Sequence, residues 1–179
     1  MNRHAVKPDG DRAKLSRREG GTNRYLAIER TGAPPEHTFT LAWQEHDVPD
    51  EVYNTYTEDW LRGALTRAGL FLVAEVDGRV AGLLTVLFPT WTDAAEIGDL
   101  AVDRPLRGVG AGTALVDAAA DWARERSRRA LWVEPHANDA PAIEFYLRRG
   151  FRLSGFNDHL YSNQDDAHGR PTIYMHLEL

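Results

Sequence analysis

A glycine-rich segment in the second half of the chain has the residue types of an anion-binding loop. Its sequence is Leu100-Ala101-Val102-Asp103-Arg104-Pro105-Leu106-Arg107-Gly108-Val109-Gly110-Ala111-Gly112-Thr113. Glycine lets the backbone approach a ligand closely, and the free amides and dipole of a helix start favour an anion such as a pyrophosphate. The segment therefore favours a phosphate-bearing ligand, with a flexible turn that binds nothing as the alternative.

Two common phosphate-binding patterns do not fit this segment. A P-loop requires a lysine followed by serine or threonine after its last glycine, whereas Gly112 is followed directly by Thr113. A dinucleotide fingerprint requires another glycine three residues after Gly110, where the chain again has Thr113. Both classes are excluded by specific residues.

The elements around the loop alternate between strand and helix patterns. Apolar periodicity and breaker residues predict a strand, the loop, a helix, a short strand and a second helix that is capped by Asn138 and ended by Gly150. The expected ranges are Ala95–Val102, Asp103–Gly108, Gly110–Arg126, Leu131–Glu134 and Asn138–Arg149.

The rest of the chain supplies further strands and one more helix. The pair Asp77-Gly78 between two β-branched, apolar runs predicts a tight hairpin of Leu70–Val76 and Arg79–Phe88. The other expected elements are strands at Tyr25–Glu29, Phe39–Trp43, Phe151–Tyr161 and Pro171–Leu179, and a helix at Asp50–Ala68. This order predicts an α/β chain in which helices cover a mixed sheet.

Two motifs in this order resemble the GNAT superfamily of N-acetyltransferases. Arg107-x-x-Gly110-x-Gly112 is similar to its coenzyme loop, and the segment from Asn138 through Tyr146 to Gly150-Phe151 is similar to its second signature. The resemblance covers about residues 71–179. It implies the GNAT fold, an α+β domain whose mixed sheet of six to seven strands is flanked by about four helices. The domain is expected over residues 22–179, after a flexible tail at 1–21.

The resemblance implies acetyl-CoA as co-substrate and assigns residues to it. The amides of the loop would hold the pyrophosphate, the end of the preceding strand would pair with the pantetheine arm, Asn138 would contact the same arm, and Tyr146 would lie beside the thioester sulfur. The expected coenzyme-binding residues are Leu100, Ala101, Val102, Arg107, Gly108, Val109, Gly110, Ala111, Gly112, Thr113, Asn138 and Tyr146.

Three residues are candidates for proton transfer. The position of Glu96, six residues before Val102, resembles that of the catalytic glutamate of histone-type GNAT enzymes, which makes it the first candidate for the general base. Asp99 is the second candidate. Strict alternation places the two on opposite faces, so both can line one cleft only if the strand is irregular, as it commonly is in this superfamily. Tyr146 is expected to protonate the departing thiolate. His136 could also relay a proton, but we interpret it as a histidine of a surface loop.

The C-terminal portion further resembles streptothricin acetyltransferases. The shared features include Trp91, Ile97-Gly98-Asp99-Leu100-Ala101-Val102 and Ile173-Tyr174-Met175, although that family usually has glutamate at the position of Gly98. The resemblance implies a small, cationic amine as acceptor, such as a streptothricin-like antibiotic, an aminoglycoside or a polyamine. Asp165 and Asp166, in the loop Ser162–Arg170, could attract such a cation. The alternatives are acetylation of peptide or protein amines, and an acyl-CoA-binding sensor without turnover.

Composition narrows the class of protein further. The chain of 179 residues contains no cysteine, which excludes disulfides, thiolate metal sites and an acyl-cysteine intermediate. Six basic and three acidic side chains among the first 20 residues leave 15 basic and 24 acidic ones elsewhere, a net charge of −9 that argues against nucleic acid. The sequence has no recognisable signal peptide or membrane span, so we expect a cytoplasmic protein. It has no histidine pair with metal-ligand spacing, so we expect no metal site. The resemblance to the superfamily also makes a homodimer possible.

Overall fold

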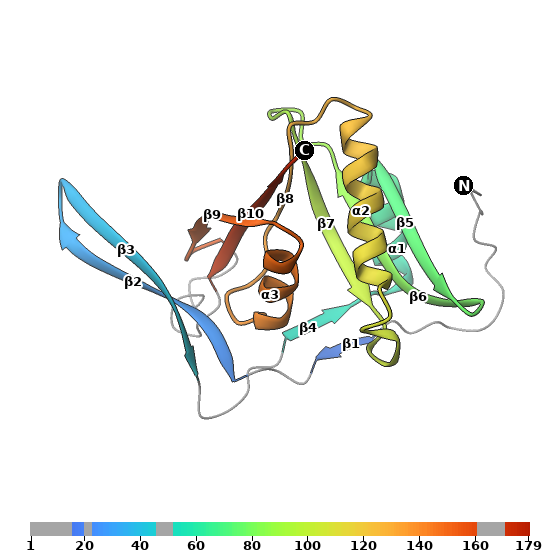
Figure 1. Ribbon diagram of the computed structural model, residues 1–179, viewed down its shortest axis with the longest axis horizontal. Coiled ribbons are helices and arrows are strands. Elements are labelled where there is room, and N and C mark those ends of the chain that lie inside the picture. Colours follow the sequence, from blue (N-terminus) through green and yellow to red (C-terminus); the bar gives the residue numbers. More distant parts are fainter. Residues whose placement is uncertain (1–15, 20–22, 46–51, 161–170) are drawn as a thin grey trace.

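A mixed sheet of six strands forms the centre of the molecule (Figure 1). The computed structural model describes residues 16–19, 23–45, 52–160 and 171–179. The strand order is β5-β6-β7-β8-β10-β9, in which only the pair of β7 and β8 is parallel. These strands are β5 (Leu70–Val76), β6 (Arg79–Leu87), β7 (Ala94–Val102), β8 (Ala130–Val133), β9 (Arg152–Asn157) and β10 (Thr172–Glu178). The expected mixed sheet is therefore confirmed, with six strands.

The hairpin of β5 and β6 agrees with the sequence prediction almost to the residue. Asp77 and Gly78 occupy its turn with φ angles of 51° and 75°. Positive φ at both central turn positions matches the right-handed twist of the two strands, which explains why an Asp-Gly pair occurs here.

Helices lie on both faces of the sheet (Figure 1). In this view α2 (Ala111–Arg124) lies in front of β5, β6 and β7, and α1 (Glu58–Arg67) lies behind them. The described part of the chain contains three α-helices, α3 (Ala140–Arg148) being the third, together with the short 3-10 helix η1 (Arg104–Leu106). None of these helices combines the length and the apolar character needed to span a membrane.

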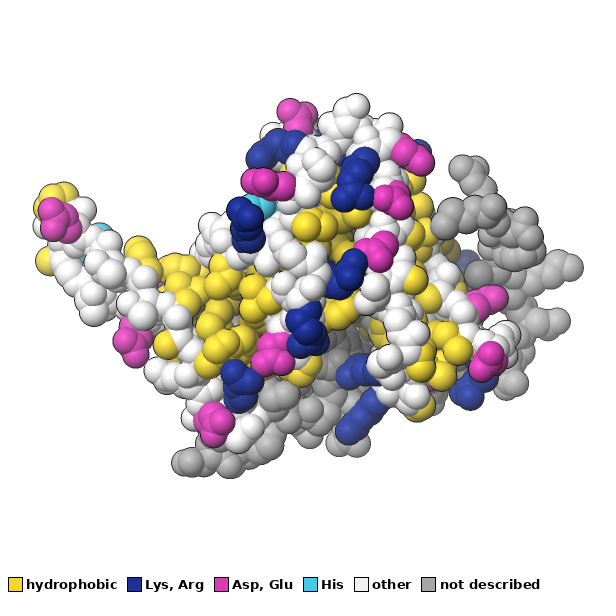
Figure 2. All heavy atoms as spheres, viewed as in Figure 1, with side chains coloured by type: hydrophobic (Ala, Val, Ile, Leu, Met, Phe, Trp, Pro, Cys, Tyr) yellow, Lys and Arg dark blue, Asp and Glu magenta, His cyan; other side chains and the backbone are white. Residues whose placement is uncertain are grey.

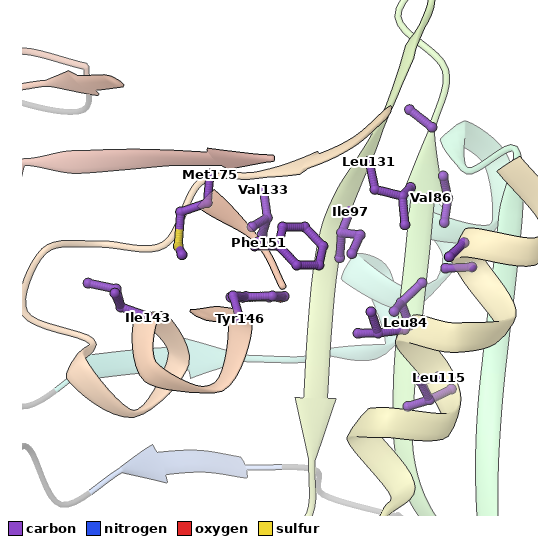
Figure 3. Close-up of a cluster of buried hydrophobic side chains, with 14 of the residues drawn as sticks. Leu84, Val86, Ile97, Leu115, Leu131, Val133, Ile143, Tyr146, Phe151 and Met175 are labelled. Carbon is purple, nitrogen blue, oxygen red and sulfur yellow. The ribbon is translucent and has the colours of Figure 1, made fainter. Parts of the chain in front are cut away.

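One continuous core lies between the sheet, α2 and α3. Figure 3 shows side chains of α2, α3 and the central strands converging in it. Its members include Leu84 and Ile97 from the sheet, Leu115 from α2 and Ile143 from α3, each at most 3% exposed. Burial of these side chains fixes α2 and α3 against one face of the sheet and leaves the opposite face for other contacts.

The first two predicted strands form a separate hairpin outside the central sheet. β2 (Arg24–Ala33) and β3 (Glu36–Glu45) pair with each other along their full length, and their distal ends project from the body (Figure 1). Hydrophobic side chains gather where this hairpin meets the body (Figure 2), and Leu26 is buried there to 4% exposure. Both strands are longer than predicted, because alternating patterns cannot show where pairing ends.

The predicted helix at Asp50–Ala68 is wrong in its first part. Residues Val52–Thr55 form strand β4, which pairs with β1 (Ser16–Glu19), and the helix begins only at Glu58. β-branched and aromatic residues favour the strand. Thr57 then caps the helix by accepting a 3.1 Å hydrogen bond from the Trp60 amide.

Parts of two other predictions fall outside the described residues. Of the expected tail at 1–21 only Ser16–Glu19 is described, and those residues form β1. Asp165 and Asp166 also lie outside the described ranges.

Candidate active site

The two parallel strands at the centre of the sheet separate to form a fork. In the described chain β7 pairs with β8 only through Ala94, Ala95 and Glu96, although β7 continues to Val102. On its other side β7 stays paired with β6 as far as Val102. The edge of β7 that faces the fork therefore offers backbone groups over Leu100, Ala101 and Val102 to a ligand, as expected from the sequence.

A bulge in β7 brings the two candidate bases together. Asp99 lies opposite Thr85 and Ile97 lies opposite Val86, so Gly98 is the extra residue between them. A bulge of one residue reverses the alternation, which places Glu96 and Asp99 on the same face of the sheet. The condition under which both carboxylates could line one cleft is therefore met.

Gly98 is closely surrounded at this bulge. A Cβ atom there would lie 3.1 Å from both the Leu87 side chain and Thr85 Oγ1. Thr85 is itself buried and donates a 3.0 Å hydrogen bond to Asp99 Oδ2. The absence of a side chain at Gly98 allows this approach and thereby helps to orient Asp99.

Glu96 has a pKa suited to proton transfer near neutral pH. The half-buried carboxyl loses hydration, and the negative charges of Glu134 and Asp99 repel its ionised form, which together raise its pKa from 4.5 to about 7. A base is most effective when its pKa lies near the working pH. Sequence reasoning missed Glu134, whose only local signal is its place at the end of a short central strand.

The glycine loop has the conformation of an anion cradle. Gly108 and Gly110 have φ angles of 81° and 95°, which side chains rarely tolerate, and a Cβ on either would meet no atom within 4 Å. The first helical amide to bond back is that of Ala114, which donates to the Gly110 carbonyl. Among the described residues, the amides of residues 108–113 have no backbone acceptor, so this surface is open to an anion.

Gly112 and Arg107 have structural roles beside this cradle. A Cβ on Gly112 would touch Val102 Cγ2 at 3.4 Å and the Phe145 ring at 3.5 Å, so this glycine mainly allows α2 to approach α3. The Arg107 Nε donates a 3.2 Å hydrogen bond to the Val102 carbonyl. The cradle is thereby tied to the end of β7.

The second signature places Tyr146 near the fork. Figure 3 shows its ring pointing from α3 toward β7, beside Phe151. The ring is 4% exposed, and its centroid lies 5.1 Å from that of Phe151. The residues assigned to the coenzyme thus surround one region formed by β7, the start of α2 and α3.

The cap of α3 differs from the prediction. Asp139, not Asn138, is the N-cap residue, and its Oδ1 accepts a 3.1 Å hydrogen bond from the Ala142 amide. The cap lies one residue later than expected, and Pro141 lies in the first turn of the helix. Asn138 is buried directly before the cap.

His136 is more enclosed than a histidine of a surface loop. Its backbone forms an isolated bridge to Thr172, and its side chain is partly buried. No group of three or more histidine or acidic side chains suited to a metal ion occurs within residues 16–19, 23–45, 52–160 and 171–179.

Known proteins similar to this chain share both its sequence and its fold. A sequence profile of the Acetyltransferase (GNAT) family matches residues 35–151. A streptothricin acetyltransferase of Streptomyces lavendulae is 35% identical over 120 residues, which cover 67% of this chain and 63% of that protein. A streptothricin acetyltransferase of Escherichia coli is 28% identical over 108 residues, or 60% of this chain and 59% of its own length. The chain therefore matches less than two thirds of either relative.

Two solved structures resemble the whole chain more evenly. A nourseothricin acetyltransferase superposes with a TM-score of 0.71 at 29% identity, covering 92% of this chain and 90% of its own. A protein of Bacillus anthracis, solved in complex with acetyl coenzyme A, gives a TM-score of 0.68 at 21% identity, covering 88% of this chain and 87% of its own. The second likeness concerns the fold alone.

Proposed function

Because the chain belongs to the Acetyltransferase (GNAT) family, we propose that it transfers the acetyl group of acetyl-CoA to a primary amine of a small, cationic molecule. The observation that carries this proposal is the position of Glu96. Its half-buried carboxyl, with a pKa of about 7, lies at the point where β7 leaves β8. A base of that strength, beside an open strand edge and an anion cradle, suits amine acetylation.

The cradle and the fork bind different parts of the coenzyme. The amides of residues 108–113 hold its pyrophosphate, and the open edge at Leu100, Ala101 and Val102 pairs with its pantetheine arm. The Arg107 amide, which the sequence also assigned to the pyrophosphate, instead donates a 3.3 Å hydrogen bond to the Arg104 carbonyl. Asn138 contacts the same arm. The bound coenzyme supplies an activated acetyl group as a thioester.

Glu96 removes the proton that blocks attack by the amine. An alkylamine has a pKa of about 10.4 and is mainly protonated at neutral pH, whereas only the free amine is a nucleophile. Glu96 accepts this proton directly or through water, and Asp99 is the second candidate on the same face.

Two further groups complete the transfer in a ternary complex. The amine nitrogen forms a bond to the acetyl carbon, and the bond from this carbon to sulfur breaks. A backbone amide near Leu100 stabilises the negative charge that develops on the carbonyl oxygen. Tyr146 then protonates the departing thiolate, so the products are an N-acetyl amine and free coenzyme A.

Charge on the acceptor side supports a cationic substrate. Glu96 and Asp99 lie on one face of the sheet, and the negative charge of Glu134 is close enough to act on Glu96. The chain beyond its first 20 residues also has the negative balance noted above. Two relatives and one solved structure are named for streptothricin or nourseothricin. A cationic amine of that kind is the acceptor we propose.

The test is thiol release from acetyl-CoA with a panel of acceptors. The panel contains streptothricin, aminoglycosides, polyamines and peptides with a free amino terminus, and mass spectrometry identifies each product. We expect turnover with one of the small cations. Turnover with peptides alone would favour a peptide acetyltransferase, and coenzyme binding without any turnover would favour a sensor.

A further inference from the structure

Glu134 lies beside Glu96 because of how the two parallel strands pair. Glu96 is directly opposite Trp132, and Glu134 follows two residues later, just beyond the end of β8. If the alternation of β8 continues by one residue, Glu134 has the same facing as Glu96. Neighbouring strands are about 4.8 Å apart and two residues rise about 6.6 Å along a strand, so a diagonal neighbour lies about 8 Å away. β8 ends at Val133, so Glu134 lies at the mouth of the fork.

Among the described residues, no positive charge contributes to the pKa shift of Glu96. On this face β6 presents Leu87 and Thr85, and β10 presents Tyr174 and His176. The helix on this side of the sheet, α1, keeps its charged residues exposed, namely Glu58, Asp59, Arg62 and Arg67. Within the described chain, the charges that shift the pKa of Glu96 are those of Glu134 and Asp99, with Glu134 the larger.

We propose that Glu134 is a positioning residue whose carboxylate sets the pH range over which Glu96 accepts the proton of the acceptor amine. This inference rests on the proposed function of Glu96. Glu134 acts through Glu96 and itself forms no bond to the reacting atoms. With Glu134, the proposed site includes residues from both strands of the fork, β7 and the end of β8.

The sign of the effect follows from like-charge repulsion. A negative charge near Glu96 disfavours its ionised form, so removing that charge lowers the pKa of Glu96. Glu96 then stays deprotonated at lower pH and becomes a weaker base. The acid limb of the rate profile moves to lower pH, and the plateau rate falls.

The kinetic test compares pH profiles of kcat/KM for Glu134→Gln, Glu134→Asp and the unaltered protein. The Gln variant should move the acid limb down by about one pH unit and lower the plateau by less than about tenfold. The Asp variant keeps the charge and should retain most of the original profile. Glu75→Gln is the matched control, because Glu75 is exposed on β5 and its loss changes the net charge equally.

A second measurement separates this inference from the proposed function. Carboxyl-carbon NMR follows the titration of Glu96 without any acceptor, and the Glu96→Gln variant identifies its signal. The midpoint should fall by about one pH unit in Glu134→Gln and stay unchanged in Glu75→Gln. An unchanged midpoint in Glu134→Gln, or an equal shift in the control, overturns the inference whether or not the protein acetylates an amine. Absence of turnover together with the expected midpoint shift would remove the function and keep the electrostatic pairing.

Discussion

At the scale of single residues, the surroundings of Glu96 at the fork alter its acid–base chemistry. Glu96 is a stronger base than an ordinary glutamate because burial and two neighbouring carboxylates disfavour its charge. The bulge at Gly98 is what places Asp99 among these neighbours. A single extra residue in one strand therefore changes the electrostatics of the whole site.

Replacing Glu96 by glutamine should reduce acetyl transfer and leave coenzyme binding nearly unchanged. Gln keeps the shape of the side chain and cannot accept the amine proton, and general-base catalysis contributes roughly 10² to 10⁴ in rate. Steady-state kinetics gives the loss in kcat, and calorimetry gives the affinity for acetyl-CoA. Full activity at neutral pH would exclude Glu96 as the base.

The same substitution should stabilise the protein at neutral pH. The pKa of Glu96 rises from 4.5 to about 7 on folding, so its contribution to stability is fully present below pH 4.5 and is lost as pH rises through 7. Because the group is half exposed, solvent screening reduces the effect to roughly 1 to 2 kcal/mol. Denaturant unfolding of Glu96→Gln should show this gain in the free energy of unfolding above pH 7 and none near pH 4.5. A gain that does not depend on pH would contradict this account.

At the scale of elements, the start of α2 combines two kinds of glycine. Gly108 and Gly110 supply positive φ angles on an open surface, whereas Gly112 makes room for Phe145. The first pair shapes the cradle, and the third lets the helix that bears it pack against α3. Glycine therefore has two roles at the start of α2, in the shape of the loop and in the packing of the helix.

Replacing Gly110 by leucine should weaken acetyl-CoA binding by tenfold or more, on the order of 1.4 kcal/mol. The side chain would extend into the space that the cradle leaves open, and the φ of 95° adds backbone strain. Gly78→Leu is a matched control, because Gly78 also has a positive φ of 75° and free space around it. Calorimetry should show weakened binding for the first variant only. Equal affinities in the two variants would count against the cradle.

At the scale of the whole molecule, an N-terminal hairpin is attached to the body near the second signature. The Leu26 amide donates a 2.9 Å hydrogen bond to the Ala137 carbonyl, directly before Asn138. The Arg24 guanidinium pairs with Glu144 of α3 at 2.8 Å. An isolated two-stranded hairpin is only marginally stable in water, so these contacts and the buried Leu26 hold the hairpin in place.

Replacing Leu26 by alanine should lower the free energy of unfolding by about 2 to 5 kcal/mol. The residue is 4% exposed and belongs to the main core, so its truncation leaves a cavity at the base of the hairpin. Leu65→Ala is the control, because Leu65 on α1 is 59% exposed and its loss should cost about 0.5 kcal/mol or less. Denaturant unfolding measures both values. Similar losses in the two variants would show that Leu26 does not anchor the hairpin.

Several features could be predicted from the sequence because their signals are local. The Asp77-Gly78 turn, the glycine loop and the helix of the second signature each depend on residue types within a few positions of one another. The secondary structure was predicted less well where the sequence pattern fits both a helix and a strand. At residues 52–55 an apolar pattern fits a helix or a strand, and pairing with β1 decided for the strand.

Only the tertiary structure determined which distant residues meet. The separation of β2 and β3 from the central sheet, the bulge at Gly98 and the proximity of Glu134 to Glu96 all depend on which strands pair and in which register. Register is decided by the burial of whole faces against other elements, and no short stretch of sequence contains that information. The sequence by itself determined the glycine loop that we propose to bind the coenzyme, whereas the fold determined the electrostatic surroundings of Glu96.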